Sequence, residues 1–270
     1  MAHALRVRTS GLLGGAQPAP APPVAAISVP QRHDVELALL DAMPLSAEWC
    51  YSQQPHDLQE LCDLHGSDKG SRGDRPTPYP WRPHNYADLY AQLFDHCRAA
   101  VGLVFECGIG SADLSMPCNM GLKGRPGASL RVWRDYFPNA EVYGADIDDK
   151  ILFEEDRIRT YHVDQTSSSS IEAMWQAIGR DGFDLMIDDG LHEVDGGIPL
   201  FERSIDRLAP GGVYIIEDVR PDQLPVYSAY FAAREYRASI VVLRREPREM
   251  AQNNLVIVRK PWSAQPRLGR

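Results

Sequence analysis

The sequence predicts an α/β fold with a Rossmann-like, seven-stranded, mostly parallel sheet that ends in an antiparallel hairpin. Two observations carry this prediction. From residue 101 onward, short β-rich runs alternate with longer helical stretches, which is typical of a parallel sheet covered on both faces. The last two β-rich runs are separated only by the charged segment RREPREMAQN, which is short for a crossover helix and therefore predicts an antiparallel pair.

The predicted elements follow one another in a regular order along the chain. Strands are predicted at 102–107, 141–146, 157–163, 183–188, 212–217, 238–243 and 254–259. Helices are predicted at about 128–136, 168–179 and 198–208, and LAPGG after the last one indicates a helix stop. We therefore expect a Rossmann-like domain at 101–262 and a helical cap over the carboxyl edge of its sheet at 31–100. The Ala/Pro-rich segment 1–30 predicts a disordered tail, and residues 263–270 form a second tail.

Composition narrows the class of protein. The 270 residues are 44% hydrophobic, and no apolar run approaches the roughly 20 residues of a membrane-spanning helix. The net charge of -9 argues against a nucleic-acid partner, and the five cysteines form no Cys-x-x-Cys pair, which is typical of free thiols in a reducing compartment. We therefore expect a cytoplasmic protein that acts on a small molecule rather than on a nucleic acid or a membrane. The sequence leaves homo-oligomerisation open.

Acidic residues lie at the carboxyl end of each of the first five predicted strands. They are Glu106, Asp146, Asp164, the pair Asp188-Asp189 and the pair Glu217-Asp218. Ligands of an open parallel sheet bind beyond the carboxyl ends of its strands, so these residues are candidates for a binding site. Asp146 is suited to the ribose hydroxyls of a nucleoside, and Asp164 with Gln165 to an adenine amine. As isolated residues, they would equally be helix caps or turn residues.

A metal site is predicted where the fourth and fifth strands end. If these strands are neighbours, Asp189, Glu217 and Asp218 converge and offer the hard oxygen ligands that Mg²⁺ prefers. His192 follows Asp189 by three residues, and an imidazole that titrates near neutral pH is suited to act as a general base there. The alternative for His192 is a cap of the next helix.

The glycine turn ECGIG is followed by a long loop. Sixteen residues separate Gly110 from the next predicted helix, whereas a dinucleotide phosphate site needs the glycine turn to open directly onto a helix N-terminus. The loop 111–126 is therefore predicted to be a functional flap, with a simple surface insertion as the alternative.

These motifs, taken in order, resemble a known family. ECGIG, YGADID, HVDQTS, IDDGLH and IIEDV resemble the class I S-adenosyl-L-methionine-dependent methyltransferases, in particular the metal-dependent O-methyltransferases that modify sugars of macrolide antibiotics. Upstream, HGSDKG and HNYADLY are similar to the segment of that family that closes over the methionine end of the cofactor. The resemblance covers roughly residues 60–260, and it departs from the family at Ala112, where the third motif glycine is expected.

The resemblance implies two cofactors, S-adenosyl-L-methionine and Mg²⁺. It places Mg²⁺ on Asp189, Glu217 and Asp218, with His192 as the base. It also implies cofactor contacts from a larger set of residues, namely Ser67, Lys69, Glu106, Gly108, Asp146, Asp164, Gln165 and Asp188.

The sequence favours one function over three alternatives. The favoured function is methylation of a sugar hydroxyl in a glycosylated natural product or a surface polysaccharide. The first alternative keeps the fold and the cofactor but uses a catechol-like vicinal diol as acceptor. The second is an NAD-dependent oxidoreductase, which Asp146 favours and the missing GxGxxG disfavours. The third is a cofactor-binding protein without catalysis, against which the intact set of Asp189, His192, Glu217 and Asp218 argues.

Overall fold

The fold is described from a computed structural model, which covers residues 47–50, 55–234, 236–244 and 251–261. The tails predicted at 1–30 and 263–270 lie outside these residues. The described strands form one sheet in the order β1-β8-β9-β7-β6-β2-β3-β5-β4. Their bounds are β1 Ala47–Cys50, β2 Leu103–Cys107, β3 Glu141–Asp146, β4 Glu154–Glu155, β5 Ile158–His162, β6 Phe183–Asp188, β7 Leu208–Ile216, β8 Ala238–Arg244 and β9 Asn254–Arg259.

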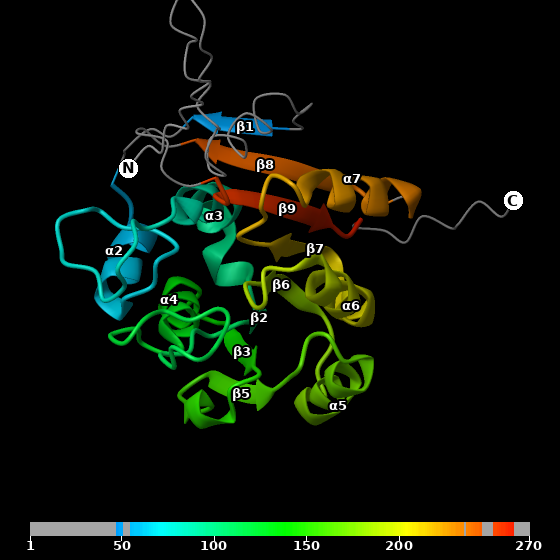
Figure 1. The fold of residues 1–270 in the computed structure, drawn as a ribbon, viewed down its shortest axis with the longest axis horizontal. Helices are drawn as coiled ribbons and strands as arrows, with labels where there is room; N and C mark the ends of the chain where they lie inside the picture. The colour runs from blue at the N-terminus through cyan, green and yellow to red at the C-terminus, as the bar shows by residue number, and fades with distance from the viewer. Residues whose placement is uncertain (1–46, 51–54, 235, 245–250, 262–270) are drawn as a thin grey trace, which may run out of the picture.

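Helices cover both faces of this sheet (Figure 1). On one face lie α2 (Asp57–His65), α3 (Tyr86–Phe94) and α4 (Ala128–Tyr136), and on the other lie α5 (Ser168–Ile178), α6 (Val194–Ser204) and α7 (Leu224–Ala233). Three 3₁₀ turns, η1 (Asp95–Ala100), η2 (Asp149–Ile151) and η3 (Ile205–Arg207), join these elements. Each face carries its own cluster of buried hydrophobic residues, so the core has two layers.

The helix α5 illustrates how the local sequence determines an element. The Ser167 hydroxyl caps its first turn by accepting from the Ser170 amide, and Gly179 ends it in the left-handed conformation at φ 61°. Its buried residues Ile171, Met174, Trp175 and Ile178 recur at helical spacing and face the sheet. These signals are local in sequence, which explains why the predicted and observed bounds nearly agree.

The strand order reverses between β2 and β6. The chain runs from β2 through β3 to β5 on one side and then returns to β6 and β7 on the other, and all of these strands are parallel. The carboxyl ends of β2 and β6 therefore form a topological switch point, where ligands bind in sheets of this kind. The predicted antiparallel pair is confirmed, because β9 runs antiparallel to both β7 and β8.

Several predicted bounds are wrong. The seven predicted strands are present, but β1 and the two-residue β4 were not predicted, and β1 lies in a segment expected to hold only helices and loops. The helix predicted at 198–208 begins at Val194 and ends at Ser204. LAPGG begins β7, because Leu208 already pairs with Phe183 before a register shift in the ladder. The helix α7 was not predicted.

None of the described helices is both long and apolar enough to cross a bilayer.

Candidate active site

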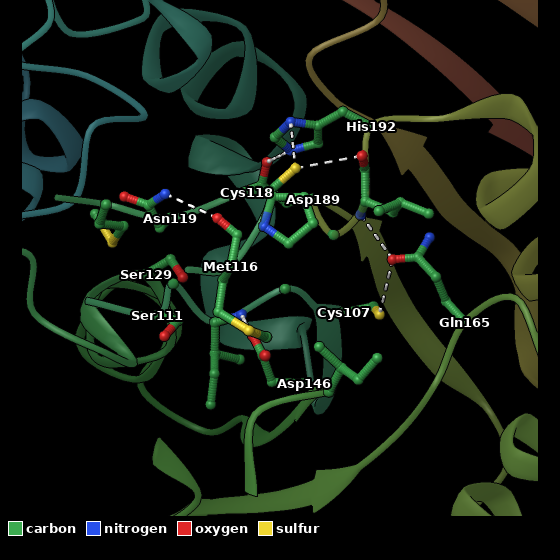
Figure 2. Close-up of a pocket in the computed structure, with 18 of the residues that line it drawn as sticks. Cys107, Ser111, Met116, Cys118, Asn119, Ser129, Asp146, Gln165, Asp189 and His192 are labelled. Carbon is green, nitrogen blue, oxygen red and sulfur yellow. Dashed lines mark hydrogen bonds and ion pairs between the residues drawn. The ribbon is translucent and has the colours of Figure 1, made fainter. Parts of the chain in front are cut away.

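A cavity of about 320 Å³ opens at the carboxyl ends of β2, β3, β5 and β6 (Figure 2). Sequence-predicted residues that line it are Ser67, Lys69, Gly108, Asp146, Asp164, Gln165, Asp189 and His192. Asp188 and Glu217 line a much smaller neighbouring pocket, and neither pocket is lined by Glu106 or Asp218. The fold therefore gathers most of the predicted residues on one cavity, as expected from the switch point.

The glycine turn after β2 brings two strand ends into close contact. Gly108 has a φ of 88°, and a Cβ there would lie 2.0 Å from the carbonyl oxygen of Asp189, so only glycine fits. Asp146 holds the same turn, because its carboxylate accepts from the Ile109 amide at 2.9 Å and from the Asp148 amide at 3.0 Å. Asp146 therefore shapes the cavity wall as well as lining it.

The amide side chain of Gln165 fixes the turn after β6. Its Nε2 donates to Asp188 at 3.2 Å, and its Oε1 accepts from the Leu191 amide at 2.8 Å. Burial raises the pKa of Asp188 to about 6. Asp164 accepts from the amide and the hydroxyl of Thr166, and the pKa of its carboxyl is lowered by these bonds. The contacts of Asp164 and Gln165 with adenine stay predictions.

Asp189, His192 and Asp218 converge at the rim of the cavity. His192 Nε2 lies 3.3 Å from Asp189 Oδ1 and 3.6 Å from Asp218 Oδ2. One ligand atom from each of these residues lies within 4.8 Å of the others, which is close enough to share a metal ion. The alternative role of His192 as a helix cap is not observed, since Glu193 is the N-cap of α6.

Glu217 is not part of this group of three residues. Its buried carboxylate accepts from the Tyr90 hydroxyl at 2.6 Å and from the ammonium group of Lys69. Lys69 Nζ also lies 2.6 Å from Asp189 Oδ2 and 3.1 Å from Glu106 Oε1. Lys69 therefore links Glu106, which the fold seals in the core, to the acids at the ends of β6 and β7.

The site contains more carboxylates than positively charged groups. Four carboxylates, those of Glu106, Asp189, Glu217 and Asp218, lie around the ammonium group of Lys69 and the imidazole of His192. Burial raises the pKa of Glu217 well above its usual range, whereas Lys69 and His192 lower that of Asp189 against the effect of burial. An excess of carboxylate charge in a buried place is stabilised by protons or by a cation. The donor set therefore fits a divalent, oxygen-preferring ion such as Mg²⁺.

Two residues of the site have a strained backbone. His192 and Asp218 have φ values of 58° and 53°, which non-glycine residues rarely adopt. The Tyr86 hydroxyl donates to Asp218 Oδ1 at 2.6 Å, and Gln223 Nε2 donates to the carbonyl oxygen of His192 at 2.9 Å. Strained residues of this kind cluster at functional sites, where the surrounding contacts hold them in place.

The loop 111–126 closes one side of the cavity. Met116, Cys118 and Met120 line the cavity, and Cys118 Sγ lies 3.3 Å from the carbonyl oxygen of Leu191 and 3.8 Å from His192 Nδ1 (Figure 2). The loop therefore reaches the candidate base, which a simple surface insertion would not do. Its function as a flap stays a prediction.

Sequence reasoning missed Tyr86 and Tyr90, although both lie in the segment HNYADLY. Their spacing of four residues places both hydroxyls on one side of α3, where they reach Asp218 and Glu217. It also missed His84, which lies 3.4 Å from Asp218, and Trp81, which lines the cavity. The spacing of the two tyrosines was the signal available in the sequence.

Known sugar O-methyltransferases are similar to this chain. It is 33% identical over 188 residues to the 8-demethyl-8-alpha-L-rhamnosyl tetracenomycin-C 2'-O-methyltransferase of Streptomyces olivaceus, which covers 70% of this chain and 44% of that protein. It is 39% identical over 172 residues to the mycinamicin VI 2''-O-methyltransferase of Micromonospora griseorubida, and this match covers 63% of this chain and 37% of that protein. The chain thus spans less than half the length of these relatives. No protein-family model matches it.

A solved structure has a similar fold. The MycE methyltransferase from the mycinamycin biosynthetic pathway, in complex with Mg, SAH and mycinamycin VI, aligns with a TM-score of 0.56 at 24% identity. The alignment covers 79% of this chain and 57% of that one. At 24% identity, this similarity is evidence for a shared fold only.

The strand order and the position of the cavity are those of a Rossmann-like fold, which the MycE methyltransferase shares. The sequence resembles the sugar O-methyltransferases of natural-product pathways, and the resemblance predicted from the motifs is confirmed.

Proposed function

We propose that the chain transfers the methyl group of S-adenosyl-L-methionine to a sugar hydroxyl of a glycosylated natural product, with Mg²⁺ at the site. The observation that carries this proposal is the convergence of Asp189, His192 and Asp218 at the rim of the cavity. The relatives support the acceptor class, since the first acts on a rhamnosylated tetracenomycin and the second on mycinamicin VI. The free cysteines of the described residues agree with action in the cytoplasm.

We assign the cofactor to the cavity. Its predicted contacts are those of the lining residues, with Asp146 at the ribose and Ser67 and Lys69 at the methionine end. Glu106 and Asp188 do not line this cavity, so they would act on the cofactor through Lys69 and Gln165, respectively.

The proposed reaction is a displacement at the sulfonium methyl group. The acceptor oxygen forms a bond to the methyl carbon while the carbon–sulfur bond breaks, which yields a methyl ether and S-adenosylhomocysteine. His192 Nε2 takes the hydroxyl proton, and Asp189 and Asp218 orient the imidazole. These two carboxylates raise the pKa of His192 well above its usual range, and a cation bound to them would lower it again, which would leave the imidazole free to accept the proton. These two carboxylates, with Glu217, would hold Mg²⁺, which would supply a positive charge that orients the acceptor and lowers the pKa of its hydroxyl.

The first test is methyl transfer from labelled S-adenosyl-L-methionine to a rhamnosylated tetracenomycin. We expect EDTA to abolish the transfer and added Mg²⁺ to restore it, because the acceptor hydroxyl is a weak acid. Asp189→Asn should lower the rate about 100-fold or more, a magnitude typical of lost general-base and metal chemistry. The matched control is Asp181→Asn, which changes an exposed acid paired with Arg207 and should leave the rate unchanged. Transfer that survives both EDTA and Asp189→Asn would remove the metal from the proposal.

A further inference from the structure

The ammonium group of Lys69 is surrounded by three carboxylates. The Lys69 side chain is only 2% exposed, and Nζ contacts Glu106 at 3.1 Å, Asp189 at 2.6 Å and Glu217 by a short hydrogen bond. These acids come from the ends of three adjacent parallel strands, β2, β6 and β7. Burial alone would lower the pKa of the Lys69 ammonium, but the three carboxylates raise it well above its usual range.

Two of the three acids are predicted metal ligands. One oxygen of Asp189 contacts Lys69 and the other faces His192 at 3.3 Å. Both oxygens of Glu217 have donors, Lys69 for one and Tyr90 for the other. Asp218 differs, because its partners are His84, Tyr86 and His192 and do not include Lys69. A metal ion and Lys69 would therefore share Asp189 and Glu217.

We propose that Lys69 is a positioning residue that serves as the counter-ion of the metal site and competes with the divalent cation for Asp189 and Glu217. This inference rests on the proposed metal-dependent function. Two positive charges that share carboxylates within a few ångströms repel each other, and in a buried place this repulsion is weakly screened. Lys69 therefore holds these carboxylates in place before the metal binds, and in return lowers the affinity for the metal.

The residue type of Lys69 and a comparison with a second lysine, Lys260, sharpen this inference. A compact ammonium group can contact three carboxylates from different directions, which a planar guanidinium does less well. The chain has only four lysines, Lys69, Lys123, Lys150 and Lys260, among 28 basic residues. Lys260 Nζ donates to backbone carbonyl oxygens, including that of Asp206 at 3.1 Å. It provides an ammonium group with hydrogen bonds but without a carboxylate partner among the described residues.

Titration calorimetry with MgCl₂ in the absence of S-adenosyl-L-methionine tests the competition directly. We expect Lys69→Met to bind Mg²⁺ about tenfold more tightly than the wild type, because it removes both the competitor and the repulsion. The matched control Lys260→Met should bind Mg²⁺ with unchanged affinity. Equal or weaker binding by Lys69→Met would overturn the inference.

Nuclear magnetic resonance of the wild type, labelled with ¹⁵N-lysine, covers the case in which Lys69→Met does not fold. Its four Nζ signals are assigned by elimination with variants of Lys123, Lys150 and Lys260. We expect added Mg²⁺ to move the Lys69 signal and not the Lys260 signal. If calorimetry detects Mg²⁺ binding but the Lys69 signal does not move, the inference about Lys69 is overturned and the proposed function stands. If neither the wild type nor any variant binds Mg²⁺, the metal is removed from the proposed function as well.

Discussion

At the scale of single residues, the site depends on backbone conformations that its neighbours must enforce. Asp218 is held at a φ of 53° with the Tyr86 hydroxyl on its carboxylate at 2.6 Å and its own amide donating to that hydroxyl at 3.3 Å. His84 stacks on Tyr86, with ring centroids 4.4 Å apart, and its Nδ1 donates to the side-chain oxygen of Asn253 at 3.0 Å. Asp218 is thus oriented by residues of the cap segment and of the segment before β9.

Tyr86→Phe should therefore weaken the metal site without unfolding the protein. Substitution of a partner that orients a metal ligand typically costs about tenfold or more in metal affinity. We expect a loss of Mg²⁺ affinity of about that size, and a decrease of about 1 kcal/mol in the free energy of unfolding. The matched control is Tyr214→Phe, which removes a buried hydroxyl that has no hydrogen-bond partner among the described residues. Unchanged Mg²⁺ affinity in Tyr86→Phe would show that the tyrosine does not orient Asp218.

At the scale of elements, the loop 111–126 has a defined packing in spite of its length. The Met120 amide donates to the Ser111 carbonyl at 2.8 Å, and the Gly127 amide donates to the Ile109 carbonyl at 2.7 Å. The side chain of Met120 fills the space beside Gly110, where a Cβ would lie 2.3 Å from its sulfur. Glycine at 110 therefore serves both the left-handed turn and the packing of the loop on it.

Gly110→Ala should be more destabilising than Gly73→Ala. Both glycines have a positive φ, 84° and 78°, so each substitution introduces backbone strain of about 1 kcal/mol or more. Only Gly110 also has a neighbour in the way, and we expect this clash to cost a further 1–3 kcal/mol, about the usual range for overpacking. Gly73 has no atom within 4 Å of the added Cβ. Urea unfolding measures both variants, and equal losses of stability would contradict the packing argument.

At the scale of the whole molecule, the sheet order creates the site. Strands β2 and β6 lie side by side although about 80 residues separate them, and this places Gly108 against Asp189. The segment that carries Lys69, Tyr86 and Tyr90 contacts the acids at the same edge. The cavity exists only when these three parts of the chain are folded together.

A ligand that fills this cavity should therefore stabilise the entire fold. At about 100 times its dissociation constant, a ligand that binds only the native state adds about 2.7 kcal/mol to the free energy of unfolding. We expect S-adenosyl-L-methionine to raise the melting temperature accordingly and NAD to leave it unchanged. Scanning calorimetry with each ligand measures this difference. Stabilisation by NAD alone would favour the oxidoreductase alternative.

Local patterns were sufficient for the fold class and for the main candidate residues. The seven strands of the central sheet were predicted because their apolar runs are continuous, and the acids at their ends were placed by a rule that applies to every parallel sheet. The helix α7 was missed because its sequence LPVYSAYFAA is apolar all round and lacks the amphipathic period. The strand β1 was missed because four residues at a sheet edge give too short a pattern.

The sequence by itself determined a Rossmann-like fold, acids at the carboxyl ends of its strands, and a resemblance to sugar O-methyltransferases. Only the tertiary structure decided which acids face one another and which share a cation. Asp189 and Asp218 meet His192, whereas Glu217 turns to Lys69 and Tyr90, more than 120 residues away in sequence. The physical reason is that the periodicity of a sequence reports which side of an element is buried. The partner of a buried charge depends on packing between elements, and packing is determined by the whole chain.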